Sequence, residues 1–334
     1  MLAQALHRGR LSAREGEHVR DWRCGMTADA APGEDPRPAA SPVHPARLNV
    51  GVVGAGRVGT ALAVALSRAG HRITAASAVS DASRQRVDRF LPGTPVRQPE
   101  EVVGAADLVL LTVPDDALPG LVRGLAATGA PVAGRLFAHA SGRHGLGVLE
   151  PATQLGALPL ALHPVMTFTG RPDDADRLVG ICFGVTAPDV LRPAAEVLVM
   201  EMGGEPVFIA EADRDLYHAA LAGAANHMVT LVVQAEDLLA KAGVGNPARM
   251  LGPLLSAALD NALRLGDAAL TGPVARGDAD TVAGHVAALR AEAPEALPAY
   301  LALARLTATR ALATGMLAAP DARRLLDVLA EAPR

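Results

Sequence analysis

The residues with the clearest chemical meaning are three glycines with the spacing GxGxxG. They follow the apolar run LNVGVV and open a stretch of helical periodicity. In such a strand, turn and helix, the backbone amides at the helix N-terminus bind the pyrophosphate of a dinucleotide. The alternative is that the glycines only form a tight turn. The candidate cofactor-binding residues of this turn are Gly54, Gly56, Arg57, Val58 and Gly59.

The end of the next apolar run, HRITAAS, indicates which dinucleotide would bind. An acidic residue usually stands there and binds the ribose 2′-hydroxyl of NAD, but this run ends in Ala76 and Ser77. Ser80 and Arg84 follow, and hydroxyl groups with a guanidinium suit a 2′-phosphate. Ser77, Arg84 and the turn residue Arg57 therefore indicate NADP (NADPH), unless the arginines only solvate a helix face.

The elements that must position these residues alternate between apolar strands and helices. The expected strands are LNVGVV, HRITAAS, a short strand that Pro164 ends, and residues 106–114, 134–141, 180–187 and 205–210. This alternation predicts an α/β fold with a doubly wound Rossmann-type parallel sheet. Only helical periodicity follows, which predicts an all-α domain. We expect a disordered extension over residues 1–46, a NAD(P)-binding Rossmann domain over 47–210 and a helical substrate and dimerisation domain over 211–334.

Two loops should border the nicotinamide, because ligands of open α/β sheets bind at the carboxyl ends of the strands. Val113, Pro114 and Asp115 follow one strand, and Ser141 and Gly142 follow the next. We expect the first loop to contact the cofactor and the second to donate hydrogen bonds to a substrate oxygen. In the alternatives, Asp115 is a helix N-cap and Ser141 caps a turn.

His163 is the first candidate for proton donation. It stands before Pro164, which ends a short strand and fixes the backbone. Histidine has a reference pKa of about 6.5, which suits proton donation at neutral pH. The alternative is a hydrogen-bonded structural histidine.

His218 and Asn226 lie on a predicted helix that begins at Asp215. With Ala222 between them they share one face at a spacing of four residues, and about 12 Å of helix axis separates them. We expect Tyr217 to project elsewhere. His218 is the second candidate acid and Asn226 a residue that orients the substrate oxygen, unless both only form hydrogen bonds inside a helical bundle.

A loop between predicted helices, GPVARGD, contains a further cation. Arg276 either binds a substrate carboxylate bidentately or pairs with Asp278 to fix the loop. The sequence does not separate the two.

Composition excludes several classes of partner. A formal charge of −4 and a pI of about 6.2 give no electrostatic footprint for nucleic acid. We see no run near the roughly twenty uninterrupted apolar residues of a membrane helix, so no membrane partner is expected. Two cysteines are too few for a disulfide framework or a metal site. We expect a reduced, cytoplasmic protein without metal.

Motifs spread over residues 48–320 together resemble a known group of Rossmann-like proteins. The motifs are GAGRVGTAL, LLTVPDDAL, FAHASG, ALHPVMTF, YHAALAGAANHMVTL and LTGPVARGD. The group carries a helical C-terminal domain of unknown function in the 6-phosphogluconate dehydrogenase C-terminal-like superfamily. Its relatives include pyrroline-5-carboxylate reductase, ketopantoate reductase and prephenate dehydrogenase. The resemblance implies an NADP-binding domain and an active site in the cleft between two domains.

One position departs from the hydroxyacid dehydrogenase relatives. They carry a catalytic lysine one turn before the asparagine that Asn226 matches, whereas this sequence has Ala222 there and its only lysine is Lys241. The usual acid is therefore absent, which leaves His163 or His218 as its replacement.

The leading hypothesis is an NADP(H)-dependent oxidoreductase that reduces the C=O or C=N of a small carboxylate-bearing metabolite. By family analogy, a ketopantoate-like 2-oxo acid is the first substrate candidate and a cyclic imine the second. The alternative is an NADP-binding regulatory or scaffold protein without turnover, which the absent lysine permits. Alanine- and leucine-rich C-terminal helices carry more apolar surface than a lone bundle needs, which predicts a homodimer formed through residues 211–320.

The neutral end of the second strand predicts a cofactor preference. NADPH should raise the melting temperature more than NADH at equal concentration, because a ligand that binds only the folded state stabilises it more as its concentration exceeds its dissociation constant further. Thermal-shift measurements with both nucleotides check this. Equal or reversed shifts would remove the NADP assignment.

Overall fold

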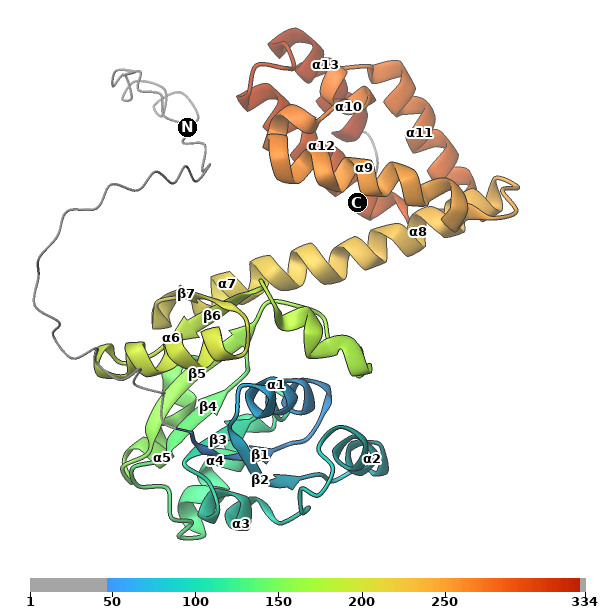
Figure 1. Ribbon diagram of the computed structural model, residues 1–334. Coiled ribbons are helices and arrows are strands. Elements are labelled where there is room, and N and C mark those ends of the chain that lie inside the picture. The colour runs from blue at the N-terminus through green and yellow to red at the C-terminus, as the bar shows by residue number, and fades with distance from the viewer. Residues whose placement is uncertain (1–46, 331–334) are drawn as a thin grey trace, which may run out of the picture. The chain divides into compact units, whose positions relative to one another are not determined.

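A computed structural model describes residues 47–330, so the predicted disordered extension 1–46 lies outside the described residues. Seven strands form one sheet in the order β2-β1-β3-β4-β5-β6-β7 (Figure 1). The strands are β1 (Asn49–Val53), β2 (Arg72–Ser77), β3 (Leu108–Leu111), β4 (Leu136–His139), β5 (Leu158–Pro164), β6 (Cys182–Thr186) and β7 (Glu205–Phe208). The doubly wound α/β prediction is confirmed.

The sheet is not wholly parallel, and on this point the prediction is wrong. The first five strands run parallel, but β6 pairs antiparallel with β5 and carries β7 parallel to itself. Parallel neighbours need a crossover that is usually an α-helix. Residues 165–181, between β5 and β6, contain only two short 3-10 turns, η2 (Pro172–Asp174) and η3 (Asp176–Leu178).

Helices cover both faces of the sheet. One core packs under α1 (Arg57–Arg68), α2 (Asp81–Phe90) and α6 (Arg192–Glu201), and the other under α3 (Pro99–Gly104), α4 (Leu118–Ala127) and α5 (Glu150–Thr153). Successive strand residues alternate between the cores, so Val52 lies in the first and Val53 in the second. Burial on both faces explains why the strands are apolar throughout.

Helices alone follow β7 within the described residues. They are α7 (Arg214–Ala222), α8 (Met228–Lys241), α9 (Pro247–Leu265), α10 (Pro273–Arg276), α11 (Ala279–Glu292), α12 (Leu297–Ala313) and α13 (Ala319–Ala330). A third core lies among the last four of these, and α12 presents Ala304, Ala308 and Ala311 to it. Such small side chains let the helices approach closely, as the alanine-rich composition suggests.

One long helix runs from Glu211 to Lys241. A π-helical turn, Gly223–His227, joins α7 to α8 inside it. By length and composition this helix qualifies as a membrane span, contrary to the sequence expectation, and the 18-residue window that qualifies is not buried. The guanidinium of Arg214 and the hydroxyl of Tyr217 bind groups of the sheet. These contacts tie the start of the helix to protein rather than to lipid.

Candidate active site

The glycine turn between β1 and α1 has the backbone geometry that its spacing predicts. Gly54 has a φ of +93°, which side chains disfavour. A methyl group on Gly54 would lie 2.8 Å from Cγ1 of Val113, and one on Gly59 would overlap the hydroxyl of Thr112. Both glycines are therefore required for the turn to pack against the chain that leaves β3.

Gly56 is open where the other two glycines are crowded. The atom nearest to a methyl group there would be 3.9 Å away, and no side chain caps the N-terminus of α1. A dinucleotide pyrophosphate approaches the backbone at this position and binds the first amides of the helix. Val58 packs against the core while Arg57 is exposed. The residues of the turn thus fit a pyrophosphate.

The hydroxyl groups at the end of β2 are engaged with the backbone. Oγ of Ser77 accepts a hydrogen bond of 3.1 Å from the Gly54 amide, which ties β2 to the glycine turn. Oγ of Ser80 accepts one of 3.2 Å from the Ser83 amide and caps α2. These contacts give Ser77 and Ser80 positioning roles in addition to the binding role predicted from their hydroxyls.

A cavity of about 430 Å³ also lies at the end of β2, and Arg84 and Arg97 line it. Arg84 pairs with Asp81 at 3.2 Å, and exposed pairs of this kind are weak. Glu101 is an acid of this cavity that the spacing from the glycine turn did not indicate; it accepts a 3.0 Å hydrogen bond from the Gln98 amide. The cavity therefore offers two cations and one carboxylate that is already bound.

The loop after β3 links the glycine turn to the loop after β4. Val113 contacts Gly54 on one side. On the other side, the carbonyl of Asp115 lies 3.2 Å from Nε2 of His144. The predicted loops are thus neighbours along the carboxyl edge of the sheet.

The structural alternatives for the two loops are that Asp115 is a helix N-cap and that Ser141 caps a turn. Only the second is observed. The N-cap of α4 is Ala117, so an N-cap role for Asp115 is wrong. A backbone turn, in which the Ala117 amide donates to the Pro114 carbonyl at 2.9 Å, precedes the helix and delays its start. Ser141 does cap a turn, because its Oγ accepts a hydrogen bond of 3.1 Å from the His144 amide.

His139 ends β4 as a buried neutral imidazole. Its Nδ1 accepts a hydrogen bond of 3.2 Å from the Ser141 amide, so Nε2 carries the proton and donates to the Gly145 carbonyl at 2.9 Å. Burial lowers the pKa of His139 to about 4, and the nearby guanidinium of Arg214 lowers it further. His139 therefore shapes the loop that carries Ser141 and Gly142.

His163 lies at the end of β5 among residues from three elements. Its Nδ1 is 2.8 Å from the Tyr217 hydroxyl, and its ring meets the His218 ring edge to face with centroids 6.4 Å apart. A methyl group on Gly142 would lie 2.9 Å from Nε2 of His163 and 2.8 Å from Cδ2 of His218. The structure thus brings together three predicted site residues, with Gly142 between the two imidazoles.

Tyr217 points into this site, so the prediction that it projects elsewhere is wrong. Its hydroxyl lies over β6, where any side chain at Gly184 would overlap it. Gly184 is also the strand partner of His163. The orientation of Tyr217 follows from how α7 docks on the sheet, which helical periodicity does not specify.

Burial lowers the pKa of His163 to about 4, and the positive charge of Arg214 lowers it further. The imidazole is therefore neutral at pH 7, and proton donation by His163 stays a prediction. Burial raises the pKa of Tyr217, so its phenol keeps a proton that it can donate to Nδ1. Nε2 of His163 has no hydrogen-bond partner within residues 47–330. All fully buried side-chain nitrogen and oxygen atoms of the described residues do have a partner, so Nε2 is not one of the fully buried atoms. Nε2 is therefore accessible.

Arg214 holds this arrangement together from α7. Its side chain is 2% exposed and no carboxylate within residues 47–330 forms an ion pair with it. Its Nε donates to Thr186 Oγ1 at 2.8 Å and its Nη2 to the Gly184 carbonyl at 3.0 Å, while longer bonds reach the carbonyls of Ala161 and Ser141. One guanidinium thus joins β5, β6 and the loop after β4 to α7.

Sequence reasoning missed Arg214 and Glu211. The Glu211 carboxylate accepts hydrogen bonds of 2.6 Å from the Leu146 amide and 3.0 Å from the Gly147 amide. Glu211, Arg214 and Tyr217 recur every three residues directly after the last strand. That spacing puts all three on one face of a helix, and it is the signal that could have identified them.

Comparison with known proteins agrees with this architecture. Residues 34–164 match the Rossmann-like domain family, and residues 181–307 match a domain of unknown function, DUF2520. The chain carries a Rossmann-like domain followed by a DUF2520 domain. The group to which the sequence was likened is thereby confirmed. Arg214, Tyr217 and His218 belong to the DUF2520 domain, whereas His163 and Gly142 belong to the Rossmann-like domain.

Solved structures share this two-domain fold at low sequence identity. BF3122 of Bacteroides fragilis, named as an NADP oxidoreductase, is 22% identical, with 79% of this chain and 98% of that chain covered at a TM-score of 0.66. An imine reductase from Pseudomonas sp. is 19% identical, with 81% and 96% covered at 0.58. Pyrroline carboxylate reductase of Plasmodium falciparum with NADP bound is 12% identical, with 79% and 98% covered at 0.51. These likenesses establish the fold.

Two other candidates in the DUF2520 domain lie outside the cluster around His163. Asn226 falls in the π-helical turn, and its side chain is exposed. Arg276 donates to Asp278 at 2.8 Å and to the Thr271 carbonyl at 2.5 Å, so it fixes its own loop, as one of the two alternatives states. Their substrate contacts stay predictions.

Replacing Arg214 tests whether it holds the site. Arg214→Met should lower the free energy of unfolding by about 3 kcal/mol or more, because buried acceptors lose their donor. The matched control is Arg143→Met, which removes an exposed arginine 3.7 Å from Asp215 and should change stability by less than about 0.5 kcal/mol. Urea unfolding measures both. Similar losses in the two variants would contradict the role of Arg214.

Proposed function

We propose that this protein is an NADP(H)-dependent reductase that transfers hydride to the C=O or C=N of a small carboxylate-bearing metabolite. The observation that carries the proposal is a continuous series of contacts along the carboxyl edge of the sheet. Gly54 contacts Val113, the loop of Val113 binds His144, and the loop of His144 places Gly142 against His163. A pyrophosphate turn and an accessible imidazole thus stand on one edge, where ligands of such sheets bind.

The chain's own residues fit the cofactor at two points. The first amides of α1, with Gly56, would hold the pyrophosphate, and Arg84 would meet a 2′-phosphate in the cavity at the end of β2. When bound, the dinucleotide supplies the hydride. The Plasmodium reductase of the same fold has NADP bound, which supports the choice of cofactor.

His163 would act as a neutral hydrogen-bond donor. Tyr217 donates to Nδ1, which leaves the ring proton on Nε2, beside Gly142. As the substrate oxygen or nitrogen gains negative charge, this N–H stabilises it. His218, which is half-buried beside it, connects the site with solvent for proton supply.

The substrate class rests on family likeness. A ketopantoate-like 2-oxo acid remains our first candidate. A cyclic imine is the second, since two proteins of the same fold are named an imine reductase and a pyrroline carboxylate reductase. Ala222, in place of the catalytic lysine of hydroxyacid dehydrogenases, favours one other function, an NADP-binding regulator or scaffold without turnover. Oxidation of NADPH with any member of a panel of oxo acids and imines decides between them.

His163→Ala should lower turnover at least about a hundredfold and leave NADPH affinity nearly unchanged, because a positioned donor acts on the reacting atom and not on the cofactor phosphates. His218→Ala should lower turnover by a smaller factor. Tyr217→Phe, which leaves the imidazole in place without its partner, should also cost less than His163→Ala. Steady-state kinetics and NADPH titration of the three variants check this; near-normal turnover in both histidine variants would exclude histidine as the donor.

The pH dependence of turnover separates a neutral donor from a charged one. With a pKa of about 4, His163 is neutral throughout the neutral range. Turnover that depends on the neutral ring should therefore be level from about pH 6 to pH 8. If turnover instead falls about tenfold for each unit by which the pH rises over that range, the rare protonated form of His163 is the donor.

We also propose that a second copy of this chain covers α8 in a cytoplasmic homodimer. No residue of α8 is buried, and exposed apolar side chains continue along α9. Residues 216–235 contain no Asp, Glu, Lys or Arg, so this surface can meet itself across a two-fold axis without like-charge repulsion.

Val229→Glu should weaken the proposed dimer, because it places a charge on the uncovered face, where Val229 is 60% exposed. The matched control is Val190→Glu, a change at a valine that is 86% exposed in the Rossmann-like part. Light scattering at micromolar concentration should give a dimer for the wild type and the control. A concentration-independent wild-type monomer, or solubility only in detergent, would contradict the proposal.

A further inference from the structure

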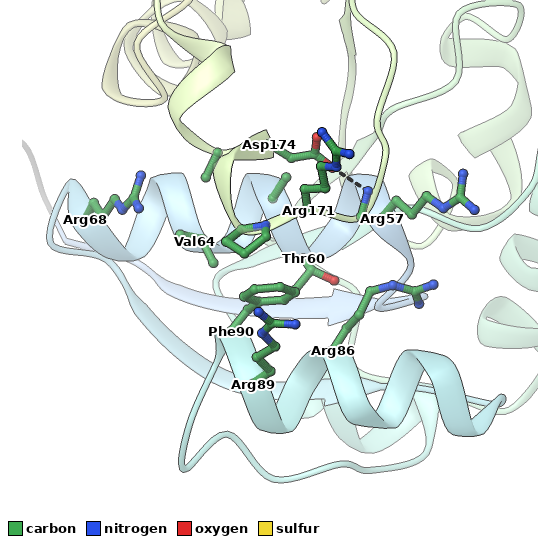
Figure 2. A pocket seen from close by; sticks show the side chains of 13 residues that line it. Arg57, Thr60, Val64, Arg68, Arg86, Arg89, Phe90, Arg171 and Asp174 are labelled. Atoms are coloured by element: carbon green, nitrogen blue, oxygen red, sulfur yellow. Dashed lines mark hydrogen bonds between the residues drawn. The ribbon is translucent and has the colours of Figure 1, made fainter.

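A second basic pocket lies on the face of the sheet that α1, α2 and α6 cover, between α1, α2 and the segment that leads from β5 to β6. It encloses about 230 Å³. Figure 2 shows α1 across its middle, α2 on one side and the β5–β6 segment on the other. The arginines that line it come from all three segments and are Arg57, Arg68, Arg86, Arg89 and Arg171.

Most of these positive charges have no ion-pair partner among the described residues. Within residues 47–330 only Arg68 has an ion-pair partner, Asp176 at 2.7 Å. The single carboxylate that lines the pocket, Asp174, accepts hydrogen bonds of 2.6 Å from the Gly170 amide and 3.1 Å from the Thr169 hydroxyl. These bonds lower the pKa of Asp174 against the effect of its burial. Four of the five guanidinium groups therefore remain available.

The segment between β5 and β6 forms one wall of the pocket and packs against its arginines. Asp174 fixes its turn, and Gly170 adopts a φ of +80° that few side chains tolerate. A methyl group on Gly170 would lie 3.3 Å from Cγ of Arg57 and 3.6 Å from Nε of Arg86. The turn thus packs directly on arginines from two helices and carries Arg171 to the same opening.

The floor of the pocket is apolar. Val64 and Phe90 line it together with Ala61, and the guanidinium of Arg89 lies over the Phe90 ring, 5.2 Å from its centroid. A cationic rim over an apolar floor complements a compact ligand that carries both anionic oxygens and an apolar body. Arginine pairs bidentately with phosphate oxygens and stacks on planar groups, so phosphate esters fit better than isolated carboxylates.

We propose that this pocket binds a small organic phosphate in addition to, and apart from, the dinucleotide. The pocket extends along α1 from Arg57 to Arg68, about 16 Å of helix axis, and so leads away from the turn that would hold the pyrophosphate. Arg57 alone belongs to both places. A ligand here would therefore border the cofactor phosphates through one shared arginine, without occupying their position.

Calorimetric titration of the full chain tests the proposal, with sodium pyrophosphate and phenyl phosphate as ligands at fixed ionic strength. Both should bind saturably, and phenyl phosphate should bind more tightly than inorganic phosphate, titrated as the reference ligand, because of the apolar floor. The double change Arg89→Gln with Arg171→Gln should weaken binding about a hundredfold, since each charge-assisted hydrogen bond contributes about tenfold. The exposed arginines of the matched control, Arg192→Gln with Arg264→Gln, pair elsewhere and should leave affinity unchanged.

Four results would overturn the proposal. They are absence of binding, equal weakening in the control, loss of pyrophosphate binding in saturating NADPH, and tighter binding of a short single-stranded oligonucleotide than of either phosphate. The NADPH arm distinguishes this proposal from the proposed reductase. If NADPH does not bind, the proposed reductase function is wrong. The arginine variants still show whether the pocket binds a phosphate.

Discussion

The guanidinium of Arg214 is a full positive charge in the protein interior, and the geometry of the candidate site depends on it. A buried charge without a counterion is costly unless hydrogen bonds replace its hydration. Here a threonine hydroxyl and backbone carbonyls from β5, β6 and the loop after β4 do so. These carbonyls cannot be removed by substitution, so the charge is held by the backbone itself and α7 is fixed to the sheet.

The same charge determines the chemistry that the neighbouring histidines can perform. Burial and the field of Arg214 together keep His139 and His163 neutral. A neutral imidazole keeps one N–H donor and one acceptor, and the partner of one nitrogen decides which form is present. For His139 the partners are backbone groups, and for His163 the partner is Tyr217. The first ring is therefore structural, whereas the second leaves an accessible nitrogen.

The parts of the site that follow local rules could be predicted from the sequence. The glycine turn is one such part, because the positive φ of Gly54 and the close packing at Gly59 are required by the short strand, turn and helix itself. The spacing of Glu211, Arg214 and Tyr217 marks one face of α7. The groups that this face contacts, however, could not be predicted, because docking of a helix depends on distant residues such as Gly184. The burial of Arg214 could not be predicted either, because the carbonyl groups that bind its guanidinium come from β5, β6 and the loop after β4.

The π-helical turn at Gly223–His227 separates the part of the long helix that is bound to the sheet from the part that is not. A π turn accommodates one residue more than an α turn, and one residue corresponds to about 100° of rotation about the helix axis. This extra residue therefore sets the azimuth of α8 relative to α7. The set of α8 side chains that faces a neighbour therefore depends on this insertion in the helical register, in addition to the contacts of Arg214 and Tyr217 that fix α7. The face of α7 that contacts His163 and the uncovered face of α8 are thus held in a fixed angular relation by this one turn.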